Sequence, residues 1–295
     1  MNFYFNHFSE NNVAVNQLFA LTEQLVNGIL SYLTSPQRIS LVFESENSIF
    51  RNYLFNNYIT LVSDVDTKEF LLLIEEQSPM LNHIVEEDLS KFSINFFPSF
   101  NIDSLILDIF IACYIYNGIL ASLSVPEWNS EYFNFTLNEA NEYKIIQIRN
   151  ISNEIHGRFH LSIIKIEQIK RDFIDWTFSD QVISFYKDLT LQEKDQVYDR
   201  MKHCKEHNFT DQGNIIRHII DSRNIEDRYK INDLYELKCC TAESSFNTGE
   251  QGWIRIFYVR RNKKTYMIFG VIKPDNFGYD DYIKKSVDNL NIMLK

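Results

Sequence analysis

The run Trp253–Val259 (WIRIFYV) followed by Tyr266–Ile272 (YMIFGVI) decides how the C-terminal part of this chain folds. Both segments are rich in β-branched and aromatic residues, as strands are, and a polar, basic turn separates them. A shorter alternating run, Leu234–Lys238 (LYELK), precedes them. We therefore expect three consecutive strands, followed by a final helix that begins near Tyr279.

Alternation along these strands predicts a sheet with two different faces, because successive side chains of a strand point to opposite sides. One face is expected to carry Glu236, Lys238, Trp253, Arg255 and Phe257. The other is expected to pack against helices through Ile254, Ile256 and Tyr258.

Upstream of the three strands, the pattern predicts a strand over Phe173–Phe178 and then two helices. Ser179 or Asp180 is expected to cap the first helix, and the sequence Thr190–Glu193 fits a capping box at the start of the second. A short helix is expected over Ile215–Ile220. Residues 171–295 therefore form the second of two predicted domains, with the boundary between Arg158 and Arg171.

Residues 1–165 are predicted to form a separate mixed α/β or α+β domain. Strands are expected over Ile39–Phe43 and Tyr58–Val62, and a helix over Thr67–Gln77. An apolar helix, capped by Asn101 or Ser104, is expected to run to about Ser122. We find no glycine-rich phosphate loop and no metal-binding pattern here, so the sequence does not indicate what this domain does.

Charge is distributed unevenly along the 295 residues, whose net charge is −11. Residues 1–170 hold 9 basic and 20 acidic residues, whereas the last 45 hold 9 basic and 4 acidic residues. We find neither a run of apolar residues long enough to cross a membrane nor a secretory signal, so a cytoplasmic protein is expected. The four cysteines lack metal-ligand spacing, and we expect no metal and no cofactor.

In this order of elements, residues 171–295 resemble the RelE/ParE/HigB-like toxins of bacterial toxin–antitoxin systems. The likeness rests on three segments, which match that family's "LYELR", "G-x-x-R-h-h-Y" and "hHGFxKK" strands (h is a hydrophobic residue): Leu234–Lys238, Gly252–Tyr258 and Phe269–Lys273. The resemblance implies a small antiparallel sheet packed by helices, so the whole chain is expected to be an α+β protein.

The resemblance also implies candidate site residues. Members with ribonuclease activity use basic residues and often a tyrosine, and the matching positions here are Arg255, Lys238, Lys273, and Tyr279 or Tyr282. Further basic residues are candidates for contacts with RNA, namely Arg260, Arg261, Lys263, Lys264, Lys284 and Lys285. A strand arginine between apolar residues, such as Arg255, is also typical of a structural salt bridge.

The function implied is that of a toxin that cleaves mRNA, either free or on the ribosome, in a toxin–antitoxin, stress or phage-defence setting. The expected partners are mRNA or the ribosome and an antitoxin or regulatory protein, with no membrane. The acidic N-terminal domain would be a regulator, a sensor or a partner-binding module; in one version of this hypothesis its surplus carboxylates cover the basic strand face until a signal releases them. Two alternatives remain: a non-catalytic module that binds a gyrase-like target or an antitoxin, and a structural or interaction protein.

Overall fold

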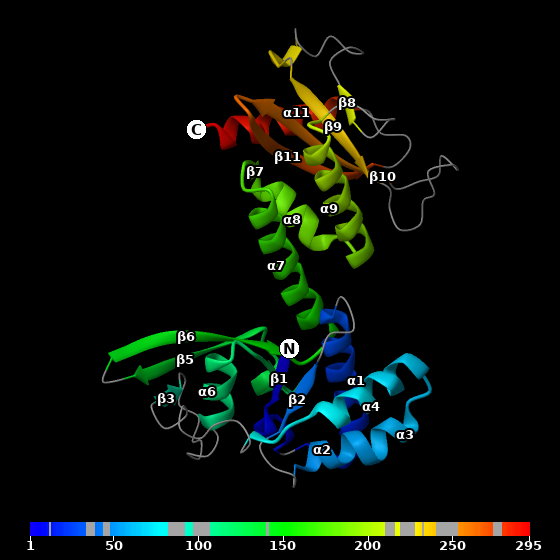
Figure 1. The fold of residues 1–295 in the computed structure, drawn as a ribbon, viewed down its shortest axis with the longest axis vertical. Helices are drawn as coiled ribbons and strands as arrows, with labels where there is room; N and C mark the ends of the chain where they lie inside the picture. The colour runs from blue at the N-terminus through cyan, green and yellow to red at the C-terminus, as the bar shows by residue number, and fades with distance from the viewer. Residues whose placement is uncertain are drawn as a thin grey trace. The chain divides into compact units, whose positions relative to one another are not determined.

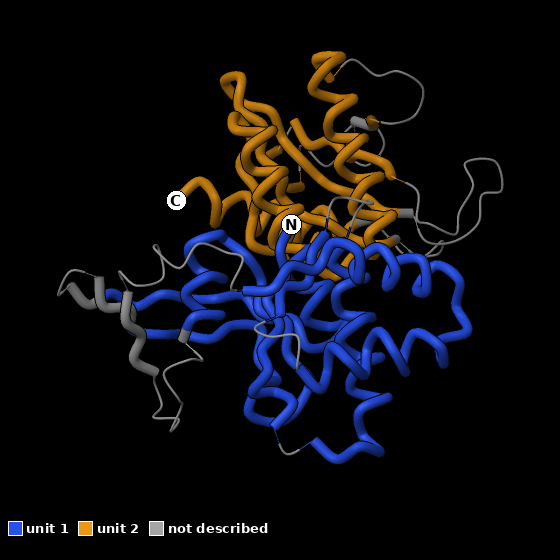
Figure 2. Tube along the Cα trace, turned by 60° about the horizontal axis from the view of Figure 1, so that its bottom comes forward, with its two compact units in different colours: residues 1–161 blue, residues 162–295 orange. Residues whose placement is uncertain are grey.

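The chain divides into two compact units, residues 1–161 and residues 162–295 (Figure 2). The computed structural model describes residues 1–11, 13–33, 39–43, 48–81, 92–96, 107–139, 142–209, 216–218, 228–231, 233–239, 253–273 and 279–295. The division falls within one helix, α7 (Glu154–Asp172). Each unit combines a sheet with helices, which confirms the predicted α+β class.

The first unit is built on a six-stranded sheet of order β2-β1-β4-β6-β5-β3 (Figure 1). Strands β2, β1, β4 and β6 run parallel, whereas β5 pairs antiparallel with both β6 and β3. The strands are β1 (Asn2–Phe5), β2 (Ser40–Val42), β3 (Phe92–Phe96), β4 (Ile119–Ala121), β5 (Tyr132–Glu139) and β6 (Glu142–Ile151). The helices are η1 (His7–Glu10), α1 (Val15–Tyr32), α2 (Ile49–Tyr53), η2 (Leu54–Tyr58), α3 (Ile59–Leu61), α4 (Val65–Gln77), α6 (Leu107–Ile115) and η5 (Pro126–Trp128).

Two predictions for this unit are wrong. The segment Tyr58–Val62 is not a strand but ends the helical run α2–η2–α3. Its buried residues recur at helical spacing, as Phe50, Leu54 and Tyr58, and this periodicity outweighs the β-branched composition of the last turn.

The apolar helix α6 stops earlier than predicted. Asn117 has a positive φ of 48°. The N–H of Gly118 donates to the carbonyl of Cys113 at 2.8 Å, and the N–H of Asn117 donates to that of Tyr114 at 3.2 Å. This is a Schellman ending, in which asparagine takes the left-handed position. The apolar residues that follow form β4, the strand beside β1 in the parallel sheet.

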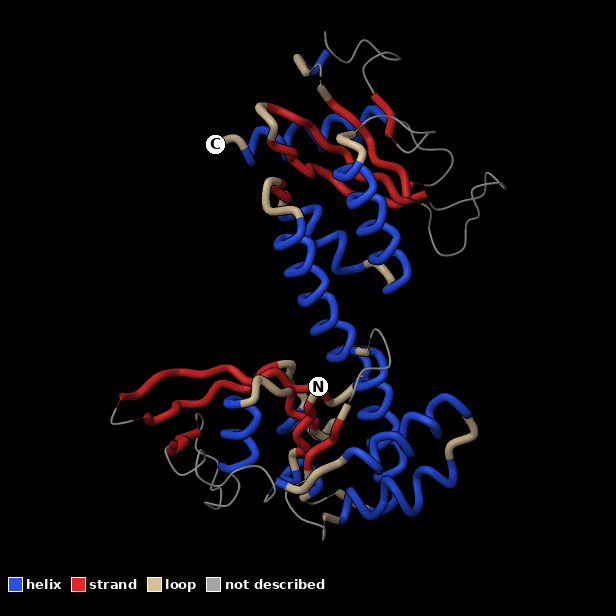
Figure 3. Tube along the Cα trace, viewed as in Figure 1, coloured by secondary structure: helices blue, strands red, loops and turns tan. Residues whose placement is uncertain are grey.

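The second unit is built on a five-stranded sheet of order β7-β11-β10-β9-β8 (Figure 3). Strand β7 runs parallel to β11, and the other neighbours are antiparallel. Its strands are β7 (Trp176–Phe178), β8 (Ile216–His218), β9 (Leu234–Cys239), β10 (Trp253–Arg261) and β11 (Lys264–Lys273). Its helices are α8 (Asp180–Asp188), α9 (Leu191–Glu206) and α11 (Tyr279–Met293), together with the C-terminal half of α7.

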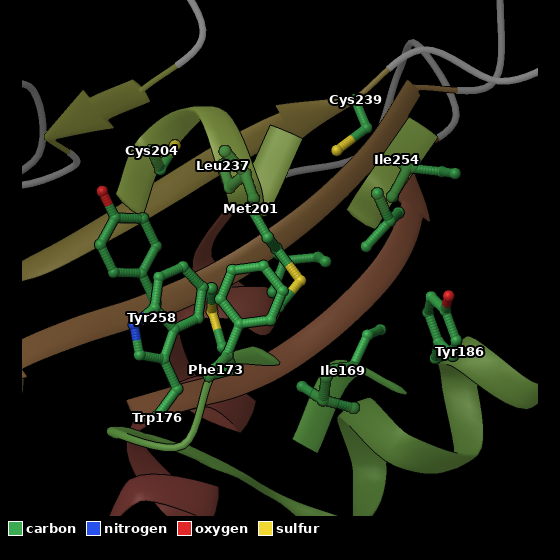
Figure 4. Close-up of a cluster of buried hydrophobic side chains, with 14 of the residues drawn as sticks. Ile169, Phe173, Trp176, Tyr186, Met201, Cys204, Leu237, Cys239, Ile254 and Tyr258 are labelled. Carbon is green, nitrogen blue, oxygen red and sulfur yellow. The ribbon is translucent and has the colours of Figure 1, made fainter. Parts of the chain in front are cut away.

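Each face of this sheet has its own apolar core. On one face, helices α7, α8 and α9 pack against Ile254, Ile256 and Tyr258 (Figure 4). On the other face, α11 packs against Phe257 and Val259 (Figure 1). The predicted alternation of β10 is therefore confirmed.

Capping residues begin the two helices where the sequence predicted. The Ser179 side chain accepts a hydrogen bond from the N–H of Val182, and Thr190 and Glu193 form the capping box of α9. Two other details differ: Ile216–His218 is a strand, and β7 begins only at Trp176. The sequence pattern does not reveal the strand Ile216–His218, because three residues are too few to show a period.

Candidate functional site

Three basic residues take neighbouring positions at one end of the second unit's sheet. Lys238 of β9 lies directly opposite Arg255 of β10, and Lys273 of β11 lies opposite Trp253. Arg255 and Trp253 are two residues apart on one strand, so all three basic positions belong to the same face. Lys273 is placed here by its backbone register alone. The structure therefore brings together three residues that are distant in sequence.

Arg255 is held by a buried carboxylate. Its Nε atom lies 3.7 Å from Oε2 of Glu236, and the two side chains are 10% and 0% exposed. Its Nη1 atom donates to the carbonyl of Ile254 at 3.1 Å. Glu236 lies on β9 two residues before Lys238, so the carboxylate shares the face with two cations. The sequence placed Glu236 on this face but did not predict the ion pair.

Burial of this pair has an energetic consequence. A charge removed from water is costly unless it is paired, and the loss of one partner leaves the other uncompensated. Arg255 and Glu236 therefore depend on each other for the stability of the fold. Arg255 is thus both a salt-bridged strand arginine and the centre of the basic face.

Helix α11 borders the Arg255 end of this face. The ring of Tyr282 lies 6.4 Å from that of Phe257 and 6.1 Å from that of Phe269, between ring centroids. Phe257 follows Arg255 by two residues, so the first turn of α11 is next to the basic positions. Tyr282 is 8% exposed and belongs to the core, and burial, aided by Asp281, raises its pKa. Tyr279 occupies the first position of α11, one turn earlier.

The two arginines of the β10–β11 hairpin have structural partners. The Arg260 guanidinium lies 4.1 Å from the ring centroid of Phe209 and donates to the Asn208 side chain at 3.3 Å. Arg261 binds the Asp233 carboxylate through two hydrogen bonds of 2.6 and 2.9 Å. Both arginines therefore fix the hairpin to neighbouring segments.

The remaining candidate RNA contacts are exposed lysines: Lys263, Lys264, Lys284 and Lys285. Lys263 lies in the two-residue turn Asn262–Lys263, where both residues have positive φ, as a type I′ turn requires. This turn is at the opposite end of β10 from Arg255, roughly 20 Å away at the rise of a strand. The basic residues of the unit thus fall into two groups.

The first unit contains a polar cluster that the sequence did not indicate. The Ser152 hydroxyl lies 3.0 Å from Nδ1 of His156, and Nε2 of His156 lies 4.0 Å from a carboxylate oxygen of Glu131. Burial lowers the pKa of His156, while Glu131 opposes that shift. Ser152 is 0% exposed and also donates to Asn129 at 3.0 Å. A hydroxyl without access to solvent cannot receive a substrate, so this cluster anchors the start of α7.

Neither a metal-binding group nor a membrane-spanning helix is found in the part of the chain that is described. The rings of His203 and His207 stack with centroids 4.1 Å apart, but no group of three or more His, Cys, Asp or Glu in the described ranges could hold a metal ion. No helix in those ranges is long and apolar enough to cross a membrane.

Comparison of the chain with protein-family models, curated proteins and solved structures finds no match.

Substitution of the buried pair tests its structural role. Arg255→Ala leaves the Glu236 carboxylate buried without its guanidinium, and we expect the free energy of unfolding to fall by about 3–5 kcal/mol. The double variant Glu236→Gln/Arg255→Gln removes both charges and is expected to regain most of this loss. Urea unfolding of the three proteins measures the difference. A double variant that is less stable than Arg255→Ala would refute the mutual dependence of the two charges.

Proposed function

We propose that the second unit is a RelE-like toxin domain that cleaves mRNA, either free or on the ribosome. The observation that supports this most is the register that brings Lys238, Arg255 and Lys273 to one face and one end of the sheet. The order strand, helix, helix, four strands, helix, from β7 to α11, also agrees with the resemblance seen in the sequence, apart from the additional short strand β8.

The chemistry of RNA cleavage suits such a face. Attack of a 2′-hydroxyl on phosphorus builds negative charge on the phosphate oxygens, and fixed cations stabilise that charge. Arginine is always protonated, so Arg255 can clamp a phosphate but cannot serve as a base. Lys238 and Lys273 would share the charge from the neighbouring strands.

A proton donor for the leaving oxygen is the remaining requirement. The tyrosine of the family matches two positions: Tyr279, the first residue of α11, and Tyr282, whose ring packs against those of Phe257 and Phe269. Either of these two tyrosines is our candidate for the donor. The exposed lysines of the hairpin and of α11 would contact more distant phosphates of the RNA or the ribosome.

The alternative of a non-catalytic binding module also has an observation in its favour. Arg255 is only 8% exposed and is paired with Glu236, as expected for a structural arginine. In that case the same face, or its exposed lysines, would bind a protein such as a gyrase-like target or an antitoxin.

Expression in bacteria separates these functions. We expect the full chain to arrest growth and to cleave mRNA, detected as new 5′ ends in total RNA. Glu236→Gln/Arg255→Gln, which removes the guanidinium without leaving a buried charge, should abolish both effects. Lys165→Gln on α7, whose ammonium bonds Asp195 at 2.6 Å, is the control and should remain toxic. Growth arrest that survives in the double variant would favour the binding module, and a lack of toxicity in every protein would favour a structural role.

We also propose that the acidic first unit restrains the second. A fragment that begins at Ser152 keeps all of α7, whose Ile166 and Ile169 belong to the core of the second unit. Without the excess carboxylates of residues 1–151, this fragment should cleave RNA faster than the full chain. Cleavage rates at equal concentration measure the effect, and equal rates would refute the restraint.

A further inference from the structure

We infer that the polar cluster at the start of α7 is an acid-sensitive anchor. It holds the helix to the sheet of the first unit at neutral pH and weakens when His160 takes up a proton. The inference concerns the first unit and does not depend on the proposed function of the second. Three features support it: the hydrogen bonds of His160, the charges around the two histidines of the cluster, and the place of the cluster in the fold.

His160 ties α7 to the strands that precede it. Its Nε2 atom lies 2.9 Å from the carbonyl oxygen of Glu131 and 3.1 Å from that of Asn150. A carbonyl oxygen can only accept a hydrogen bond, so Nε2 carries the proton of the neutral ring. The residue is 1% exposed, and its ring meets that of Tyr132 edge to face at 5.0 Å. The neutral ring therefore fixes the helix to β6 and to the start of β5.

The other ring nitrogen of His160 has no use for a proton. Nδ1 is buried, and no hydrogen-bond partner for it is found among the described residues. A proton there would create a buried cation with an N–H that has no acceptor, and both are costly. Burial accordingly lowers the pKa of His160, although its two carbonyl partners oppose the shift. The fold thus accepts the neutral ring and resists the protonated one.

The charges that face the two histidines favour His156 over His160 as the site of a proton. Arg149 on β6 and His156, one turn earlier on α7, both act against a positive charge on His160. The Glu131 carboxylate instead faces His156, whose Nε2 lies 4.0 Å from it. Burial lowers the pKa of His156 as well, but this carboxylate opposes the shift. His160 is therefore the ring whose protonation costs most.

The other elements around the cluster do not change this balance. Glu154 and Arg158, on the exposed side of α7, pair with each other. Helix α1, which packs against this part of α7, has no charged side chain over residues 24–32. Glu127 in η5 is exposed, and solvent screens its charge. Glu131 is therefore the carboxylate that compensates a proton in this cluster, and it does so at His156.

The place of the cluster gives its protonation a structural consequence. Helix α7 starts in the first unit, where the N–H of His156 donates to the Asn153 side chain at 3.1 Å. The C-terminal half of the same helix belongs to the core of the second unit through Ile166 and Ile169. Weaker bonds at His160 would loosen the start of the helix and leave those core contacts in place. Acid therefore acts on one end of a helix that both units share.

Hydrogen exchange of the full chain, followed by mass spectrometry at pH 7.5 and pH 5.5, tests the anchor. The pKa of an unfolded histidine is ~6.5 and that of folded His160 is lower, so the stabilisation is complete above pH 6.5 and is lost as the pH falls below it. After correction for the chemical exchange rate, we expect the protection of amides 156–161 to fall about tenfold at pH 5.5. Amides of β10, a strand without histidine, are the internal reference and should stay within about twofold.

Two substitutions assign the effect to His160. His160→Gln keeps an N–H donor for the two carbonyls but cannot be protonated, so the fall should shrink to within about twofold. His156→Gln is the matched control on the same helix, and it should retain a fall of at least about fivefold. An acid-induced fall in His160→Gln as large as that in the wild type would overturn the inference, as would unchanged protection in the wild type.

Glu131→Gln provides a second test in case His160→Gln does not fold. It keeps the size of a side chain that is 43% exposed and removes the charge that faces His156. Both rings then resist the proton, and the fall in protection should be at least about twice that of the wild type. A fall no larger than that of the wild type would contradict the role given to the charges of this cluster.

Discussion

The buried ion pair between Glu236 and Arg255 is the constraint around which the second unit is organised. The two charges lie on adjacent strands of a sheet that has an apolar core on each face. Neither can be buried alone at acceptable cost, so adjacent strands must keep the register that brings them together. One face packs against α7, α8 and α9 through an apolar cluster, while α11 packs against the other face. The ion pair therefore depends on the register of β9 and β10, and the same register places Lys238 opposite Arg255.

Strand β10 contains arginines with two different roles. Arg260 contacts an aromatic ring and an asparagine, and Arg261 binds an aspartate through two hydrogen bonds. They hold the hairpin turn against its neighbours. Arg255 pairs with a buried carboxylate and lies opposite Lys238, with Lys273 at a neighbouring position of the same face. This grouping of basic positions at one end of the sheet, rather than the number of basic residues, supports the proposed RNA site.

Much of this architecture could be predicted from local patterns, and the failures have physical causes. Alternation placed Ile254, Ile256 and Tyr258 on the helix-packed face, and side-chain capping marked the starts of α8 and α9, because both signals are local. The prediction of a strand over Tyr58–Val62 was wrong. The composition of this segment suits a strand, but the buried residues before it repeat at helical spacing. The Glu236–Arg255 pair could not be predicted, because it depends on the register between strands that are separated by a long connection. The polar cluster of the first unit could not be predicted either, because Glu131 and His156 come together only when the β5–β6 hairpin forms.

The salt dependence of RNA binding tests most directly whether the basic face contacts phosphates. For a single strand, each phosphate neutralised contributes about 0.7 to the slope of log affinity against log salt concentration. Replacement of Lys238 by Ala should therefore lower the magnitude of the slope for decauridine RNA by about 0.7, and replacement of Lys273 should have the same effect. The control Lys165→Ala, on α7, should leave the slope unchanged. Slopes that do not change in the Lys238 and Lys273 variants would contradict the account, because the face would then hold no phosphate.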